Sequence, residues 1–533
     1  MKAFLLYPDR DFDPTLLLSR RERGLRQQEK ELARELEQSL PWNHAALCQD
    51  LGLNVLLDTM AGGDGFLFEA AMIGLLKGVT DSAVITYRQE IMRDCLESAA
   101  VVRQIYEIVM QALKGQRERH WSIMSRYPAG TLHHAVDVLG VFVEGVKKLR
   151  AVADQNKETF KSRGFSRLFS MLQAELSDNY FAVIDQHLRR LKFSGGVLVS
   201  AQLSKGNKGT NYVLRRPHRE RGWLARLLPQ SEGYAYHLHP RDEAGAQALG
   251  TLRDRGVNLV ANAMAQSMDH ISSFFQMLRT ELAFYVACLN LYEQLLRLGV
   301  PVCFPNPTDL GQQLLSFAGL YDVSLAISKN ATVVGNDLNA NGKNFIVVTG
   351  ANTGGKSTFM RSLGLAQVMM QAGMFVPANE FSAEVRSAVV THYKREEDIT
   401  MESGKLDEEL HRMSEVVERL RPGSMLLMNE SFAATNEREG SEIATQITTA
   451  LMEKGVKICY VTHLYHFAHR LHEKGLPNVV FLRAERRPDG SRTFKLIEAG
   501  PLQTSYGEDL YRQVFSQEKS DASESPKIAF ARG

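Results

Sequence analysis

The stretch NFIVVTGANTGGKSTFMRS, residues 344–362, joins an apolar run to a turn with three glycines, and a lysine and two hydroxyl side chains follow. Glycine inside an element costs about 0.5–1 kcal/mol relative to alanine, so three glycines in one turn indicate that a ligand approaches the backbone closely. The turn satisfies the pattern G-x-x-x-x-G-K-[ST] between a predicted strand and a predicted helix. The stretch therefore predicts a phosphate-binding loop.

Each part of this loop has a chemical role. The glycines allow backbone N–H groups to surround a β-phosphate at a helix N-terminus, where the helix dipole favours negative charge. Lys356 is expected to neutralise β- and γ-phosphate oxygens, and Ser357 to hold Mg²⁺. A chance match of a glycine-rich turn is the alternative, but both flanking elements have the required type. The predicted nucleotide-binding residues are Gly350, Ala351, Asn352, Thr353, Gly354, Gly355, Lys356, Ser357 and Thr358.

A phosphate-binding loop needs a second strand that ends in polar residues near the metal and the attacking water. SMLLMNESFAATNEREG, residues 424–440, supplies an apolar run followed by Asn429 and Glu430. Glu430 is expected to orient or deprotonate water, and Asn429 to lie at the metal in place of the usual aspartate. An ordinary buried strand with a polar end is the alternative interpretation. We predict Glu430 and Lys356 as catalytic residues, and Ser357 and Asn429 as metal ligands.

A third strand, in VKICYVTHLYHF (residues 456–467), ends at Thr462 and His463. An imidazole in this place could reach a γ-phosphate, so His463 is a further catalytic candidate. A histidine at a strand end is more often an ordinary surface or core residue. Its position after the two other motifs is what favours a catalytic role.

Short apolar strands alternate with helical segments after Pro307, which indicates a mostly parallel sheet with helices on both faces. The predicted strands lie in residues 343–350, 387–394, 424–430, 456–463 and 478–485. Before Pro307 the chain has apolar residues at helical spacing, and the long helix Met264–Gly299 ends at a proline-rich break. The predicted fold is multidomain: an α-helical core or lever domain followed by an α/β P-loop NTPase domain.

The expected domain limits follow these changes of pattern. They are an N-terminal helical extension at 1–42, a helical core at 43–300 with a short basic hairpin near 194–230, an ATPase domain at 305–516 and a disordered tail at 517–533.

Composition is that of an ordinary soluble protein: 44% of the 533 residues are hydrophobic and the formal net charge is +2. The near-neutral charge gives no argument about nucleic acid, so any DNA affinity requires a local patch. The five scattered cysteines contain no CxxC pair and indicate reduced thiols. No signal sequence or membrane span is evident, so a cytoplasmic location is expected.

Several motifs in order resemble the MutS mismatch-repair ATPases, a family of the wider ABC class. They are VVGNDLNA (333–340), TGANTGGKSTFMR (349–361), FVPA (375–378), EEDITMESGK (396–405), NESFAATNEREG (429–440), VTH (461–463) and TSYG (504–507). The resemblance covers residues 322–514 with specific motifs and is weaker over the helical half.

The resemblance implies a homodimer that sandwiches ATP between two subunits. Each phosphate-binding loop would face a signature segment of the other subunit, here Ser403, Gly404 and Lys405. Val334 and Asn336 match positions that line the adenine pocket of the family. ATP and Mg²⁺ are the implied ligands.

Three departures from the family pattern bear on function. Asn429 replaces an aspartate, so weaker Mg²⁺ binding and slow hydrolysis are expected. Leu406 and Asp407 stand where the family has Ser-Thr after the signature. The chain is also expected to lack the mismatch-recognition and connector domains, and we interpret the local Phe-x-Glu match at Phe142 as part of an apolar helix core.

An arginine-rich hairpin is the main candidate for contact with nucleic acid, because it lies where the family inserts its DNA clamp. Its cations are Lys205, Lys208, Arg215, Arg216, Arg219, Arg221 and Arg226, with Tyr212 and Trp223 between them. Such phosphate contacts give salt-dependent affinity for duplex or branched DNA without sequence information. A solvated basic loop is an equally weighted alternative.

The sequence thus favours a MutS-like ATPase that couples its nucleotide state to DNA binding, in mismatch repair or DNA structure recognition. The alternative is a nucleotide-gated interaction or scaffold protein with a degenerate ATPase site and no DNA role.

Overall fold

The computed structural model describes residues 2–10, 40–119, 127–194, 196–215, 234, 237–395, 404–487 and 491–502. Contacts divide the chain into two compact units, one of Met1–Pro14 with Glu97–Leu282 and one of Thr15–Leu96 with Ala283–Gly533. The division falls inside the long helix α10 (Glu243–Leu298), which contributes to both units. The sequence instead predicts the limit between the helical core and the ATPase domain at residues 300–305, just after the end of this helix.

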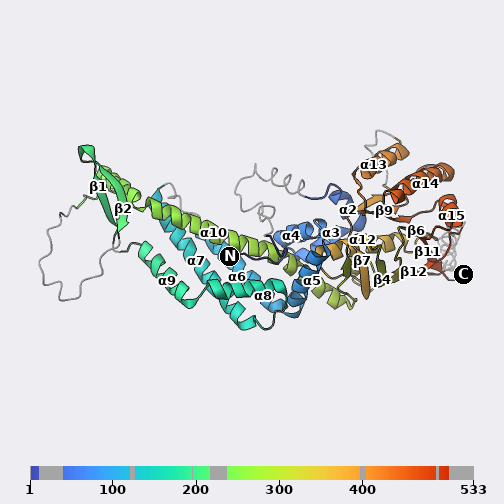
Figure 1. Cartoon of the computed structure of the whole chain (residues 1–533), viewed down its shortest axis with the longest axis horizontal. Helices are drawn as coiled ribbons and strands as arrows, with labels where there is room; N and C mark the ends of the chain where they lie inside the picture. The colour runs from blue at the N-terminus through green and yellow to red at the C-terminus, as the bar shows by residue number, and fades with distance from the viewer. Residues whose placement is uncertain are drawn as a thin grey trace, which may run out of the picture. The chain divides into compact units, whose positions relative to one another are not determined.

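The first unit is built mainly from helices, as the apolar spacing predicts (Figure 1). Phe142 is fully buried and stacks on Phe275, with ring centroids 5.0 Å apart, which confirms that this Phe-x-Glu match belongs to the core. Residues 2–10 of the expected N-terminal extension form no helix, and the backbone N–H of Leu5 donates to Glu281 at 2.5 Å. The helices are α6 (Ala99–Arg119), α7 (Pro128–Asn156), α8 (Arg163–Glu175), α9 (Asp178–Leu191) and most of α10.

The predicted hairpin is present as β1 (Leu198–Leu203) and β2 (Gly209–Arg215), which pair antiparallel. It lies beside the first part of α10 (Figure 1). That helix begins at Glu243, whereas the sequence predicted a start at Met264. Glycines interrupt the apolar helical pattern before Met264. A Cβ on Gly256 would lie 2.5 Å from Val199 of β1, so this glycine allows the hairpin to approach the helix.

The second unit contains a six-stranded sheet in the order β12-β11-β6-β10-β9-β8 (Figure 1). All neighbours are parallel except β11 and β12, which confirms the predicted mostly parallel sheet. The five strands that the sequence predicted are all present. The strands are β6 (Phe345–Thr349), β8 (Val389–Tyr393), β9 (Met425–Asn429), β10 (Lys457–Val461), β11 (Val479–Arg486) and β12 (Arg492–Glu498).

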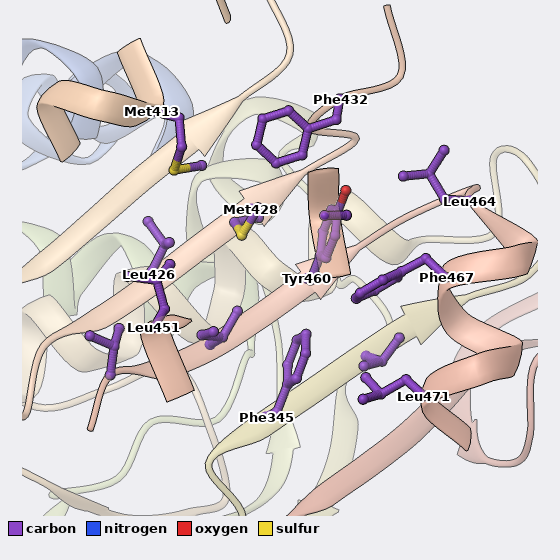
Figure 2. Packing of buried hydrophobic residues seen from close by; sticks show 14 of the residues in the cluster. Phe345, Met413, Leu426, Met428, Phe432, Leu451, Tyr460, Leu464, Phe467 and Leu471 are labelled. Carbon is purple, nitrogen blue, oxygen red and sulfur yellow. The ribbon is translucent and has the colours of Figure 1, made fainter. Parts of the chain in front are cut away.

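Alternate residues of the central strands face opposite layers, because successive side chains of a strand point to opposite faces. Phe345, Leu426 and Tyr460 belong to one buried cluster that includes side chains of α13, α14 and α15 (Figure 2). On the other face, Leu427 approaches Gly364 of α12. The covering helices are α12 (Lys356–Ala372), α13 (Lys405–Arg419), α14 (Glu437–Glu453) and α15 (Tyr465–Glu473).

A smaller sheet in the order β3-β7-β4-β5 adjoins this layer within the same unit. Asp322 caps the short helix α11 by accepting from the backbone N–H of Leu325 at 2.9 Å, and it pairs with Arg361 of α12 at 2.5 Å. The elements are β3 (Asn306–Thr308), β4 (Leu315–Leu320), α11 (Val323–Lys329), β5 (Asn336–Asn339) and β7 (Glu380–Glu384).

Four helices expected in the helical core pack instead within the second unit. Asp50 pairs with Arg395 at 2.6 Å, and buried Arg88 donates to the carbonyl oxygen of Ala372 at 3.2 Å. These contacts join residues far apart in sequence, so local periodicity could not indicate them. The helices are α2 (His44–Leu51), α3 (Leu53–Ala61), α4 (Gly65–Leu76) and α5 (Ser82–Glu97). None of the helices described is long and apolar enough to cross a bilayer.

Candidate active site

The turn between β6 and α12 has the backbone shape that its glycines require. Gly350 and Gly355 have φ of 108° and 89°, in the region that side chains disfavour. A Cβ on Gly354 would lie 2.7 Å from the Cβ of Ala484, so this position is restricted by space rather than by φ. Thr353 also has positive φ, 56°, and its hydroxyl contacts Arg492. The loop therefore turns from β6 directly into the N-terminus of α12, the strand–loop–helix order that the sequence predicted.

Lys356, the first residue of α12, lies folded against this loop. Its Nζ donates to the carbonyl oxygens of Gly350 and Ala351 at 2.9 and 2.8 Å. Burial lowers the pKa of Lys356 to about 8, and the charge of Glu430 opposes this shift. The ammonium thus lacks full solvation and is held by neutral carbonyl oxygens, so an anion that reached it would be strongly favoured.

Two oxygen-bearing side chains meet beside Lys356. Ser357 donates its hydroxyl to Oδ1 of Asn429 at 3.0 Å, although the two residues lie 72 positions apart in sequence. Asn429 is the last residue of β9, which pairs with β10, and β10 pairs with β6. The sheet therefore brings together the two residues that the sequence predicted as metal ligands.

Glu430 and His463, two of the predicted catalytic residues, contact each other. His463 Nε2 donates to Oε1 of Glu430 at 2.9 Å, and both side chains remain about one-third exposed, at 29% and 32%. This hydrogen bond lowers the pKa of Glu430, and the charges of His463 and Lys356 act in the same direction. Glu430 has a φ of +53°, and its backbone N–H donates to Val461 at 2.8 Å. A carboxylate is thereby held ionised beside the phosphate-binding loop.

Lys356, Ser357 and Glu430 border a cavity of about 670 Å³ that extends from the loop toward β4, α11 and β12, whereas Asn429 and His463 do not line it. Val334 and Asn336 line it, and Val334 is 40% exposed. Oδ1 of Asn336 accepts from the backbone N–H of Leu496 at 2.7 Å, so this side chain holds β12 against the cavity. Loop residues, Ser357, Thr358 and Glu430 complete the same wall.

Sequence reasoning missed several residues of this cavity, above all Phe494. This residue is 49% exposed and has a φ of +59°, where the pairing of β11 with β12 becomes irregular. Nothing in the local sequence indicates a positive φ at a phenylalanine. Tyr321 and Lys329 also line the cavity and come from the segment before the phosphate-binding loop.

The expected signature segment is only partly described. Gly404 is the N-cap of α13 and Lys405 is its first residue, whereas Ser403 lies outside the described residues. Neither Gly404 nor Lys405 lines the cavity of its own chain.

The basic hairpin belongs to the first unit, and its described cations are exposed. Lys205 and Lys208 lie in the turn between β1 and β2. Arg215 ends β2 and donates to the hydroxyl of Ser200 at 2.8 Å. Arg216, Arg219, Arg221 and Arg226 lie outside the described residues, as does Trp223.

Two family models match the chain in separate regions. The model described as the MutS2 N-terminal domain matches residues 80–298, and the model described as MutS domain V matches residues 346–518. The second match contains the phosphate-binding loop and the residues gathered around it.

Several characterised proteins are similar to part of the chain. A DNA mismatch repair protein MutS from Syntrophomonas wolfei is 29% identical over 207 residues, which cover 38% of this chain and 24% of that protein. The MutS of Thermus aquaticus is 27% identical over 232 residues, or 43% of this chain and 28% of that protein. MutS protein homolog 4 of Homo sapiens is 26% identical over 151 residues, or 28% and 16%. The chain thus spans about a quarter of the length of such relatives, or less. The two MutS family models match the chain one after the other, and the second match contains the residues gathered around the phosphate-binding loop. The chain belongs to the MutS family.

Proposed function

We propose that the chain binds ATP with Mg²⁺ and hydrolyses it. The observation that supports this proposal is the convergence of two contacts beside one loop: Ser357 with Asn429, and His463 with Glu430. The ends of β6, β9 and β10 supply a phosphate cradle, two oxygen ligands and an ionised carboxylate. These are the parts that phosphoryl transfer to water requires.

The triphosphate would lie along the backbone amides of the loop at the N-terminus of α12. Lys356 would leave the carbonyl oxygens of Gly350 and Ala351 and bind β- and γ-phosphate oxygens. The adenine would enter the cavity against Val334 and Phe494, which offer apolar surface. Asn336 would act through the backbone of β12, because its amide oxygen is already bound there.

The residues present fit Mg²⁺, which binds hard oxygen ligands and keeps part of its hydration when phosphate is bound. Ser357 and Asn429 would hold it, and the ion would neutralise charge on the transferred phosphoryl group. Among the described residues there is no cluster of three or more His, Cys, Asp and Glu that could form a metal site of the protein alone. Since Asn429 carries no charge, we infer weaker metal binding than an aspartate would give.

Glu430 would act on the attacking water. The lowered pKa of its carboxylate makes it a weak base, so its main contribution would be to accept a hydrogen bond and fix the position of the water. His463 would hold the carboxylate in place and, by its position at the end of β10, lie near the γ-phosphate.

We also propose a homodimer in which Ser403, Gly404 and Lys405 approach the nucleotide of the other subunit. The absence of Gly404 and Lys405 from the cavity of their own chain agrees with a contact in trans. Leu406 and Asp407 follow them and differ from the family pattern, so the trans contact would rest on the helix N-terminus and on Lys405.

A DNA-facing surface is the remaining part of the proposal. The relatives from Syntrophomonas wolfei and Thermus aquaticus are named DNA mismatch repair proteins, and the exposed Lys205, Lys208 and Arg215 suit contact with phosphates. A nucleotide-gated interaction protein without a DNA role is the competing function, which the neutral Asn429 favours because it weakens the case for efficient turnover.

Substitution of the lysine and the glutamate should separate binding from hydrolysis. Lys356→Ala should abolish ATP binding, because it removes the cation that meets the β- and γ-phosphates. Glu430→Gln should retain ATP and lower single-turnover hydrolysis at least about 100-fold. Equilibrium binding and single-turnover assays test both variants, and ATP-loaded Glu430→Gln should sediment as a dimer. Unchanged ATP affinity in Lys356→Ala would contradict the site itself.

ATP affinity should depend on pH through Lys356. Below pH 8 this lysine is protonated with or without ATP, so its contribution is full. Above pH 8 the free protein loses the proton that ATP binding requires, and affinity should fall by about tenfold per pH unit until the pKa of the complex is reached. Titration with a fluorescent ATP analogue from pH 7.5 to 9.5 measures this. Lys356→Met should bind weakly at every pH, and a flat profile for the wild-type chain would refute the assignment.

Asn429→Asp should strengthen the metal site. The added carboxylate replaces a neutral oxygen with a charged one, so half-saturation of hydrolysis should require about tenfold less Mg²⁺. Rates measured across a Mg²⁺ titration at saturating ATP provide the comparison. An Mg²⁺ requirement equal to that of the wild type would show that residue 429 does not reach the metal.

The hairpin should bind phosphates through cations with which salt can compete. Joint replacement of Lys205, Lys208 and Arg215 by Gln should reduce the slope of log K against log salt by up to about 0.9 for each phosphate that is no longer neutralised. Binding of duplex, mismatched, branched and single-stranded DNA is measured at several salt concentrations. Gln at the exposed Lys114, Arg297 and Lys474 is the matched control. If both triple variants bind like the wild type, the hairpin is a solvated loop.

A further inference from the structure

The turn that carries Glu430 has an unusual backbone. Glu430 and Phe432 have φ of +53° and +63°, a conformation that residues with a Cβ rarely adopt. A turn with two such residues persists only where its surroundings hold it, and such strain gathers at functional sites. The direction of the Glu430 carboxylate therefore depends on the groups that fix this turn.

Two contacts come from the neighbouring strand β10. The backbone N–H of Glu430 donates to Val461 at 2.8 Å, and the hydroxyl of Tyr460 donates to the carbonyl oxygen of Ser431 at 2.5 Å. These contacts fix the turn to the sheet. They leave the N–H of Phe432 to be satisfied from another element.

That element is α13, through Glu409. Oε1 of Glu409 accepts from the backbone N–H of Phe432 at 2.8 Å, and the residue is 4% exposed. Phe432 itself is fully buried in the cluster that α13 shares with the sheet (Figure 2). A buried carboxyl group on a helix thus supplies the acceptor that the strained turn needs, because a buried unsatisfied N–H is costly.

A second connection runs through His392 of β8. Its Nε2 lies 3.3 Å from the carbonyl oxygen of Glu409, and its Nδ1 lies 2.7 Å from the hydroxyl of Ser431. The Ser431 hydroxyl donates to the carbonyl oxygen of His392 at 2.8 Å, so each ring nitrogen faces an oxygen atom of this network. Burial lowers the pKa of His392 to about 4, so the ring is neutral at physiological pH and this connection does not titrate there.

The position of Glu409 on its helix gives these contacts a consequence. α13 begins at Lys405, next to Gly404, so Glu409 lies about one helical turn from the expected signature segment. A rigid helix transmits a displacement of its N-terminus to a residue one turn away. A displacement caused by contact at the signature segment would therefore be transmitted to the turn that carries Glu430.

We propose that Glu409 is a positioning residue that couples α13 to the orientation of Glu430 through the N–H of Phe432. This inference rests on the proposed ATP hydrolysis and adds the means by which the signature segment controls it. Glu409 does not line the cavity beside the phosphate-binding loop. Engagement of the helix N-terminus would set the turn, and the turn would set where Glu430 holds the attacking water.

The test compares replacements that differ in the acceptor. Glu409→Gln keeps an amide oxygen in reach of the Phe432 N–H, whereas Glu409→Met has similar length and no oxygen. We expect Met to lower single-turnover hydrolysis at least about 30-fold with ATP affinity within about threefold of the wild type, and Gln to stay within about threefold in both. Glu408→Met, one residue away on the same helix, should behave like the wild type.

Hydrogen exchange supplies a readout that a purely structural role would not change. ATP should alter the exchange of α13 in the wild type and in Glu409→Gln, but not in Glu409→Met. Glu409→Ala serves as a second variant without an acceptor. If both Met and Ala variants unfold while Gln does not, the contact serves stability alone and the inference is overturned.

The two proposals fail in distinguishable ways. A wild-type chain that hydrolyses ATP through Glu430, with Glu409→Met equal to it, keeps the proposed function and overturns the coupling. A wild-type chain that does not bind ATP overturns the proposed function, and the coupling falls with it.

Discussion

The register of three parallel strands is the constraint on which the site depends. Val461 of β10 pairs with Val348 of β6 on one side and with Asn429 of β9 on the other. The residues that follow each strand therefore emerge at one edge of the sheet, although they come from three distant segments. A slip of one residue in any strand would turn its side chains to the opposite face. The buried alternation of Phe345, Leu426 and Tyr460 prevents such a slip, so the hydrophobic core determines where the polar site forms.

The charged groups of this site surround a buried lysine. Lys356 is held by carbonyl oxygens and faces Glu430, while Asn429 beside Ser357 adds no charge. An aspartate at position 429 would add repulsion next to Glu430 and would raise the attraction for a metal ion. The neutral amide of Asn429 avoids the repulsion with Glu430, but it attracts a metal ion less strongly. By this arrangement of charge, the site favours retention of an anionic ligand over strong metal binding.

Local patterns in the sequence predicted much of this arrangement. The glycines of the phosphate-binding loop, the apolar strands and the polar residues at strand ends each express a local requirement, so Ser357, Asn429, Glu430 and His463 could be named before the fold was known. Phe494 could not, because its exposure follows from irregular pairing of β11 with β12. The place of residues 44–96 in the second unit depends on distant pairs such as Asp50 with Arg395. The start of α10 at Glu243 could not be predicted, because glycines that allow close packing, such as Gly256, interrupt the apolar helical pattern.

In the proposed mechanism, control of hydrolysis is geometric for a physical reason. The hydrogen bond from His463 keeps Glu430 ionised and makes it a poor proton acceptor, so the carboxylate contributes chiefly by its direction. Direction is set by a turn with two residues of positive φ, and such a turn has no stable preference of its own. The contacts that fix this turn would therefore also fix the position of the attacking water. The contacts from Val461, Tyr460 and His392 belong to the sheet that also carries the phosphate-binding loop. Glu409 instead belongs to a helix whose first residue lies outside the cavity wall. A support on a separate helix is the one through which another molecule could act.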